Sequence, residues 1–301
     1  MRTEKEIYDL VLNFAFQDER IRIVTLEGSR TNVNIPKDNL QDYDITFFVI
    51  DMGEFLKSDD WLSVFGNRIM MQKPEDMELF PPEEKGFSYI MLFDDGVKID
   101  LTLLPVSMLE EYLTRDKLVK IMLDKDNMIK TEIVPTDEDY YIKCPTERKF
   151  DDCCNEFWNV ATYVSKGLLR GEILFAIDHM NEVLRHELLR MISWYVGTEK
   201  GFNFSLGKNY KFLDKHISKE LWDNLLNTYS MSSYEEMWKS FDLCLCLFKK
   251  ISKKVADSLG YNYPDYDENV TKYLETQKRI SNKYLYGNRL SLIHISEPTR
   301  H

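Results

Sequence analysis

Residues 21–50 read IRIVTLEGSRTNVNIPKDNLQDYDITFFVI and decide the fold of the N-terminal half. Two runs within this stretch are rich in β-branched and aromatic residues, which predicts strands at 21–27 and 43–50. The first run ends in Gly28 and Ser29. Such a pair allows a tight turn whose backbone amides can face a phosphate group.

Two carboxylates open the second run. Asp42 and Asp44 are two residues apart, so on a strand their side chains share one face. Neighbouring carboxylates repel each other unless a cation lies between them, and a hard divalent cation such as Mg²⁺ prefers oxygen ligands. A phosphate-binding turn beside such a pair suggests chemistry on a nucleoside triphosphate.

The Asp-x-Asp pattern alone is weak, because the chain has 51 acidic residues and three further copies lie in polar, turn-like sequence. Those copies, at 124/126, 137/139 and 265/267, are better interpreted as solvated loop carboxylates. Asp100 strengthens the pair at 42/44, because it interrupts the apolar run VKIDLTLL and is costly to bury without a partner. It is either a strand-edge residue facing water or a third acid at the same metal site, and we favour the second interpretation.

The composition indicates a folded globular protein long enough for two domains, with 301 residues, 44% of them hydrophobic. A formal charge of −12 argues against a nucleic-acid partner and suits a cationic substrate, although it also serves solubility. The N-terminus does not resemble a signal peptide, and no run is long enough to predict a membrane span. Five cysteines without a C-x-x-C pair favour neither disulfides nor zinc, so we expect a reducing cytoplasm.

The remaining N-terminal elements follow from periodicity and turn signals. Residues 3–18 predict an amphipathic helix. Two apolar runs, 88–93 and 97–105, flank Asp-Asp-Gly and predict a hairpin that presents Asp100 from its second strand. Further expectations are a short helix or loop at 54–65, irregular chain at 68–85, and a helix at 106–123 with Ser107 as its N-cap.

The second half changes to helical periodicity after a segment rich in Asp, Thr and Pro at 124–149. Long apolar-striped segments predict a helical bundle from 150–166, 170–196, 219–229, 234–259 and 268–284. We therefore expect domains at 1–145 and 146–290. The last residues, 291–301, read SLIHISEPTRH, resemble a translated cloning adapter and are predicted to be a non-native tail.

The turn and the three aspartates resemble the nucleotidyltransferase superfamily, whose fold is that of polymerase-β-like enzymes. A closer resemblance, over nearly the whole chain before the tail, is to the aminoglycoside 6-adenylyltransferase family, also called streptomycin adenylyltransferase. It is carried by LEGSRTNVNIPKD, LQDYDITFFV, KIDLTLLP, PTDEDYYIKCPTERKFDDCCNEFWNV and the run 167–196. The resemblance implies an α+β chain, with an N-terminal polymerase-β-like domain built on a mixed sheet and a C-terminal helical bundle.

The same resemblance implies transfer of AMP from ATP to a hydroxyl of streptomycin, with release of pyrophosphate and antibiotic resistance. Asp42 and Asp44 would hold Mg²⁺, while Asp100 would contact the metal nearest the acceptor or take the hydroxyl proton. The Gly28 and Ser29 turn would bind the terminal phosphates. Arg30 would neutralise them, although a surface salt bridge is an equal interpretation.

Acids and aromatic residues of the helical half are candidates for acceptor binding. A guanidinium-bearing acceptor would suit Asp178 and Glu182. Trp158 would stack on it, although aromatic residues in a bundle are more often core. His179 and His186 share that helix face, but zinc is disfavoured because the usual ligand spacing is absent.

Two lysines in LGKNYKFL, Lys208 and Lys211, either reach the triphosphate or lie in a solvated loop. The alternatives to antibiotic adenylylation are a regulatory or antitoxin-like module with the same fold, and an adenylyltransferase acting on another acceptor. Three intact acids favour an enzyme. The sequence does not indicate the oligomeric state.

Overall fold

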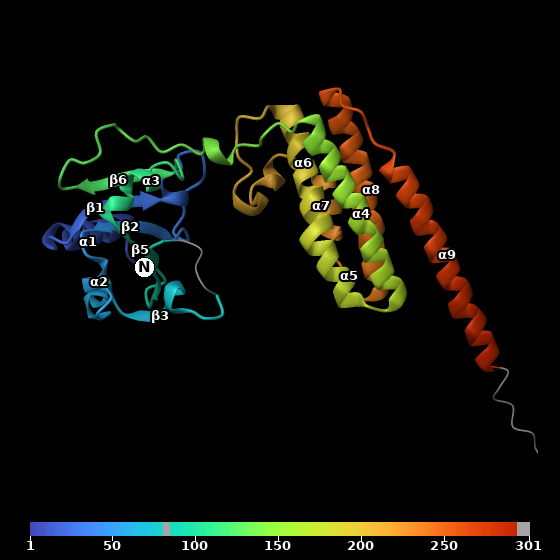
Figure 1. The fold of residues 1–301 in the computed structure, drawn as a ribbon, viewed down its shortest axis with the longest axis horizontal. Helices are drawn as coiled ribbons and strands as arrows, with labels where there is room; N and C mark the ends of the chain where they lie inside the picture. The colour runs from blue at the N-terminus through green and yellow to red at the C-terminus, as the bar shows by residue number, and fades with distance from the viewer. Residues whose placement is uncertain (81–84, 294–301) are drawn as a thin grey trace, which may run out of the picture. The chain divides into compact units, whose positions relative to one another are not determined.

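The structure, a computed structural model, describes residues 1–80 and 85–293, with side chains described through residue 280 (Figure 1). The chain divides into two compact units, Met1–Asp139 and Tyr140–His301. This division falls within the segment 124–149, where a boundary is expected.

The first unit is built on one six-stranded sheet, ordered β3-β4-β5-β2-β1-β6 within the described residues. Strands β2 and β5 are parallel, and the other neighbouring pairs are antiparallel, so the sheet is mixed. The strands span β1 Ile21–Glu27, β2 Tyr43–Val49, β3 Arg68–Gln72, β4 Phe87–Phe93, β5 Lys98–Pro105 and β6 Val119–Asp124. The predicted strands at 21–27 and 43–50 and the predicted hairpin are confirmed.

Helices cover both faces of this sheet. Helix α1, Glu4–Gln17, buries Ile7, Val11 and Ala15 against the face that carries the odd-numbered residues of β2. The opposite face has a smaller cluster, in which Phe48 packs against Tyr112 of the short helix α3, Leu109–Tyr112. The second short helix, α2, spans Met52–Phe55. Because side chains alternate along β2, Asp44 and Thr46 lie on the face away from α1.

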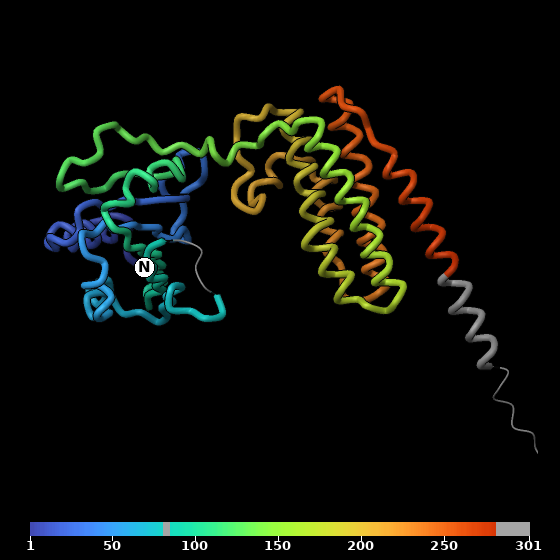
Figure 2. The backbone as a smooth tube through the Cα atoms, in the orientation of Figure 1, coloured from blue at the N-terminus to red at the C-terminus, as the bar shows by residue number. Residues whose placement is uncertain are grey.

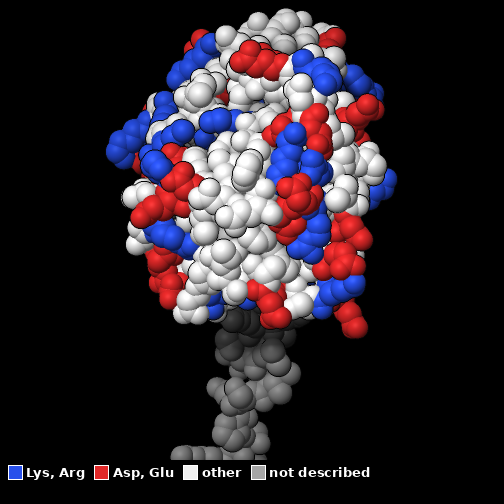
Figure 3. Space-filling view, turned by 90° about the vertical axis from the view of Figure 1, so that its left-hand side faces the viewer, with Lys and Arg blue, Asp and Glu red and all other residues white. Residues whose placement is uncertain are grey.

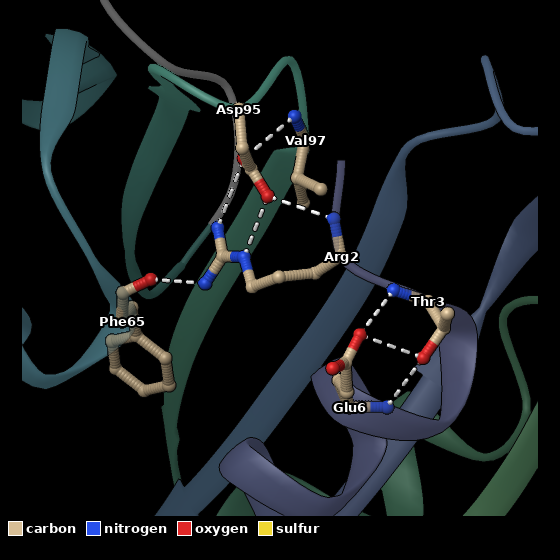
Figure 4. Close-up of polar contacts among 6 residues, drawn as sticks. All are labelled: Arg2, Thr3, Glu6, Phe65, Asp95 and Val97. Atoms are coloured by element: carbon tan, nitrogen blue, oxygen red, sulfur yellow. Dashed lines mark hydrogen bonds and ion pairs between the residues drawn. The ribbon is translucent and has the colours of Figure 1, made fainter.

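Near the N-terminus, Arg2 is bonded to the hairpin that carries Asp100 (Figure 4). The guanidinium of Arg2 donates to Asp95 in the β4–β5 turn, with Nε 2.8 Å from Oδ2, and also to the Phe65 carbonyl. Beside it, Thr3 and Glu6 form a capping box at the start of α1. Hydrogen bonds from Arg2 lower the pKa of Asp95, so the carboxylate stays ionised. Because Arg2 directly precedes the N-cap of α1, this charged pair links the start of α1 to the hairpin.

Two expectations for this unit are wrong. The segment 106–123 is not one helix, because α3 is short, Met108 rather than Ser107 precedes it, and β6 follows. Pairing with β1 creates β6, and this contact is not local in sequence. The segment 68–85 is not wholly irregular, because β3 forms an exposed edge strand at its start.

The second unit is helical, as expected. Helices α4, α6 and α8 run side by side (Figure 2). Phe157 of α4 and Phe248 of α8 stack with ring centroids 3.6 Å apart in the core between them. Helix α4 begins at the N-cap Thr146 and ends at Gly171, whose φ of +78° favours glycine. The helices span α4 Glu147–Arg170, α5 Ile173–His179, α6 Arg185–Lys200, α7 Lys219–Asn227, α8 Tyr234–Leu259 and α9 Tyr266–Ile293.

A π-helical turn, Met180–Leu184, separates α5 from α6. It changes the register of the helix face on which acceptor-binding acids are predicted. Residues 294–301, most of the predicted tail, lie outside the described residues. Among the helices of the described chain, none combines the length and apolar character that a bilayer crossing requires.

Candidate active site

The three predicted acids lie on the sheet face away from α1. Strand register places Asp44 beside Asp100, across the parallel β2–β5 pair. Asp42 lies one residue before β2. Because it is two residues from Asp44, its side chain points to the same face. The sheet therefore brings the three predicted acids to one face.

A fourth carboxylate joins them that sequence reasoning missed. Glu27, the last residue of β1, is the register partner of Asp44. Its Oε1 accepts hydrogen bonds from Thr46, from Tyr112 at 2.6 Å and from Thr25 at 3.2 Å. These hydroxyls fix the carboxylate. The available signal was its position at the end of a strand that pairs with β2.

The acids repel one another. Burial, together with the negative charges of Asp100, Glu27 and Asp42, raises the pKa of Asp44 to about 6. The same burial, with the Glu27 carboxylate, raises the pKa of Tyr112, which keeps its phenol protonated as a donor. The cluster therefore favours a bound cation.

Lys98 supplies one positive charge to this cluster, and it was also missed. Its Nζ lies 2.8 Å from Oδ2 of Asp42 and 2.8 Å from Oδ2 of Asp100. Burial alone would lower the pKa of Lys98, but the hydrogen bonds to Asp100 and Asp42 outweigh it and raise the pKa. The visible signal was its position two residues before Asp100, on the same strand face.

The donor chemistry at this face fits a hard divalent cation. The carboxylates offer only oxygen atoms as metal ligands. One of these atoms, Oδ1 of Asp100, is buried without a hydrogen-bond partner in the described structure. In the described part of the chain, no three acidic, histidine or cysteine side chains are already drawn together in a metal-ligand arrangement. The ammonium of Lys98 lies between two of the carboxylates instead.

The glycine turn lies directly against these acids. Gly28 has φ +65°, and a Cβ at this position would lie 2.7 Å from Oδ2 of Asp44. Glycine is therefore required both by the backbone and by the close carboxylate. The Gly28 amide donates to the Leu118 carbonyl at 2.9 Å, which leaves Ser29 and the amides that follow it as the candidates for a phosphate contact. Ser29 is half-buried in the same turn, a 3₁₀ turn that spans Gly28–Arg30.

Arg30, predicted either to neutralise the phosphates or to form a salt bridge, forms an ion pair with Glu4, with Nη1 3.4 Å from Oε1. Its side chain is only 6% exposed, and Nε and Nη2 donate to the carbonyls of Asp42 and Gln41 at 2.9 and 2.6 Å. The guanidinium carbon lies 3.6 Å from the centroid of the Tyr43 ring. Arg30 therefore fixes the backbone that leads into β2, and with it the position of Asp42.

In the helical unit, the structure excludes one predicted ligand-binding residue. Trp158 is 2% exposed and packs edge-on against Phe157 and Phe248 in the core. Its ring has no free surface for a bound acceptor, so the predicted stacking role is wrong. This outcome agrees with the usual role of aromatic residues in bundles.

The predicted acceptor-binding acids lie at the surface. Asp178 in α5 and Glu182 in the π-helical turn are both exposed. His179 and His186 each contact, through Nδ1, the backbone carbonyl four residues earlier, at 2.9 and 2.7 Å. Each contact orients the imidazole ring against its own helix.

A cavity of about 770 Å³ lies elsewhere in this unit, between α4, α6 and the segments that flank them. Its charged lining is Lys143, Lys149, Asp152, Glu156, Glu187 and Arg190, and Trp194 contributes an aromatic wall. Neither Asp178 nor Glu182 lines it. The predicted phosphate-binding lysines, Lys208 and Lys211, are exposed in the turn whose Asn209 and Tyr210 do line it.

Charge at the surface is mixed rather than of one sign. The face drawn in Figure 3 carries basic side chains close to acidic ones, around a broad uncharged area. The formal charge of −12 is therefore not gathered on this face.

Comparison with known proteins identifies the family. The family model described as streptomycin adenylyltransferase matches residues 1–277. The chain belongs to the streptomycin adenylyltransferase family. This result confirms the predicted family resemblance, and it confirms that the protein is an enzyme of the aminoglycoside nucleotidyltransferase class.

Relatives of this family member match over nearly their whole length. An aminoglycoside 6-adenylyltransferase from Campylobacter jejuni is 62% identical over 279 residues, covering 93% of this chain and 97% of that protein. One from Bacillus subtilis is 59% identical, covering 91% and 98%. A crystal structure of an aminoglycoside 6-adenyltransferase from Bacillus subtilis has 53% identity, covers 92% and 99% of the two chains, and gives a TM-score of 0.47.

Proposed function

We propose that this enzyme transfers AMP from ATP to a hydroxyl group of streptomycin, releasing pyrophosphate, and thereby confers resistance to the antibiotic. The observation that carries this proposal is the alignment of Asp44 and Asp100 on one sheet face, with Asp42 beside them and Glu27 opposite. The family description and the names of the relatives support the acceptor class.

In the proposed reaction, the acceptor hydroxyl oxygen attacks the α-phosphorus of ATP as the bond to the pyrophosphate oxygen breaks. The hydroxyl proton passes to a carboxylate, for which we propose Asp100. We propose that Mg²⁺ is held by Asp42 and Asp44, with Asp100 as a further ligand. Bound there, the metal would neutralise the phosphates and steady the attacking and leaving oxygens.

The turn after β1 is proposed to receive the phosphates through Ser29 and the amides that follow Gly28. Glycine is needed there because the Asp44 carboxylate approaches the turn so closely. Lys208 and Lys211 are proposed as further phosphate contacts. Their exposure and positive charge support this role.

For the acceptor, we propose that Asp178 and Glu182 bind its guanidinium groups. Their exposure leaves the carboxylates accessible to a ligand. We propose a cytoplasmic location, where ATP is available, and five free cysteines support it.

The proposal is tested by incubating the purified protein with ATP, Mg²⁺ and a panel of aminoglycosides, followed by mass spectrometry of each drug. We expect streptomycin to gain one adenylyl group. Asp44→Asn, measured in parallel, should give unmodified drug. If another aminoglycoside is modified and streptomycin is not, that drug is the acceptor in place of streptomycin. If no drug is modified, the proposed activity is refuted.

A further inference from the structure

Lys98 holds a place in the acid cluster that no part of the adenylylation chemistry requires. Its ammonium bridges Oδ2 of Asp42 and Oδ2 of Asp100, at 2.8 Å from each. The two carboxylates come from different segments, and Lys98 itself comes from β5. A single flexible side chain therefore joins two of the proposed metal ligands.

The charge around Lys98 is strongly unbalanced. Glu27 and Asp44 face the same site from β1 and β2, so the cluster holds four carboxylates and one ammonium, which contacts two of them. The nearby arginine, Arg30, donates instead to the backbone carbonyls of Gln41 and Asp42. One positive charge thus leaves the cluster negative, and a divalent cation is still attracted to it.

The four carboxylates differ in how firmly they are held. Glu27 is fixed by the hydroxyls of Thr25, Thr46 and Tyr112. Asp42 and Asp100 are held on one oxygen each by Lys98, and the other oxygen of Asp100 is buried without a partner in the described structure. A metal ion that binds this pair must therefore share or displace the contacts of Lys98.

We propose that Lys98 is the resident counter-ion of this cluster and competes with divalent metal for Asp42 and Asp100, so that it sets the metal affinity of the nucleotide-free enzyme. The inference rests on the metal site of the proposed function. Lysine suits this role because its ammonium is a single point of charge on a flexible stem and can withdraw. Arginine would grip the carboxylates through a planar fork and withdraw less readily.

The test is a Mn²⁺ titration by electron paramagnetic resonance, without nucleotide, on the full chain. Lys98→Met should bind Mn²⁺ roughly tenfold more tightly than wild type, because one neighbouring positive charge is removed. Lys98→Arg should bind it more weakly. Lys120→Met, at an exposed position on β6, is the matched control and should bind Mn²⁺ as wild type does.

Thermal unfolding gives a second readout. Without metal, Lys98→Met should melt at a lower temperature than wild type, because the carboxylates lose their counter-charge, and Mg²⁺ should raise its melting temperature more than it raises that of wild type. If Lys98→Met does not fold, Lys98→Arg and Lys98→Gln carry the same comparison, with Lys98→Gln expected to bind more tightly.

Unchanged or weaker Mn²⁺ binding in the neutral variants would overturn the inference. If the Asp44→Asn variant binds Mn²⁺ as tightly as wild type, the metal assignment is overturned, and the inference with it. Failure of the drug-modification assay, with these Mn²⁺ results as expected, would overturn only the proposed acceptor chemistry.

Discussion

The acids of the sheet and the acids of the helical unit differ in what their spacing means. Asp42, Asp44 and Asp100 lie on one face because strand side chains alternate and the register of β2 with β5 aligns them. Asp178 and Glu182 have helical spacing, but a π-helical turn intervenes and both are exposed. The spacing of acids on paired strands thus predicts that their carboxylates converge on one site. The spacing of acids on a surface helix predicts only that they lie on the same side of that helix.

The largest effect is expected at the sheet. Asp100→Asn should lower the rate of adenylyl transfer about a thousandfold, because a metal ligand or the proton acceptor is lost at a site that supplies several kcal/mol. Its unfolding temperature should stay near that of wild type. Steady-state kinetics measure the transfer rate, and circular dichroism measures the unfolding temperature. Near-normal turnover in the folded variant would show that Asp100 is not a catalytic residue.

A smaller effect is expected where the turn meets the acids. Gly28→Ala should lose about 1–2 kcal/mol of stability, because alanine at φ +65° is strained, and its Cβ would press on the Asp44 carboxylate. Transfer should fall about ten- to a hundredfold as Asp44 shifts. Ser63→Ala, at an exposed position outside the site, is the control. Wild-type kinetics in Gly28→Ala would show that the close contact does not matter.

Arg30 distinguishes a positioning role from phosphate binding. Arg30→Lys should lose about 1–2 kcal/mol of stability, because lysine cannot reproduce the paired donors and the contact with the Tyr43 ring. The KM for ATP should change little, while kcat falls as Asp42 loses its support. A large rise in the KM for ATP with unchanged stability would restore the phosphate-binding interpretation.

The link between Arg2 and Asp95 should appear as a pH dependence. Asp95→Asn should cost about 1 kcal/mol of stability at neutral pH. Because Arg2 holds the pKa of Asp95 below its ordinary value, this contribution is complete above pH of about 4 and is lost as pH falls through the lowered pKa. Urea denaturation at several pH values should show wild type and variant converging in acid. A constant difference would show that the charge of Asp95 is not the cause.

The smallest effect is expected at the helical surface. Asp178→Asn should weaken streptomycin binding by up to about fivefold and leave ATP binding unchanged, because an exposed ion pair contributes at most about 1 kcal/mol. Glu156→Gln, a substitution in the lining of the cavity, is the informative comparison. If only Glu156→Gln weakens streptomycin binding, the acceptor lies in the cavity and not at Asp178.

Local patterns in the sequence predicted the parts of the fold that local patterns determine. Alternation and the Asp-Gly turn gave the strands and hairpin around Asp100. The strand β6 escaped because it depends on pairing with β1, and the apolar residues before it fit a helix equally well. The bundle was predictable from long apolar stripes, but the π-helical turn has no comparable pattern.

The candidate site was predictable to the same extent. Asp42 and Asp44 share a face through spacing alone, and Asp100 joins them only through register. Glu27 and Lys98 escaped because charged residues at strand ends resemble solvated ones. The structure distinguishes them through the hydroxyls that hold Glu27 and the two carboxylates that hold Lys98. The roles of Trp158 and Arg30 stayed open in the sequence because burial is not visible in the residue type.

The central claim is that the sheet carboxylates carry out the chemistry, while the helical acids affect only acceptor binding. Single-turnover transfer from α-labelled ATP to saturating streptomycin should be compared in wild type, Asp44→Asn and Asp178→Asn. The account predicts no detectable transfer in Asp44→Asn and a wild-type rate in Asp178→Asn. Transfer at near the wild-type rate in folded Asp44→Asn would contradict it.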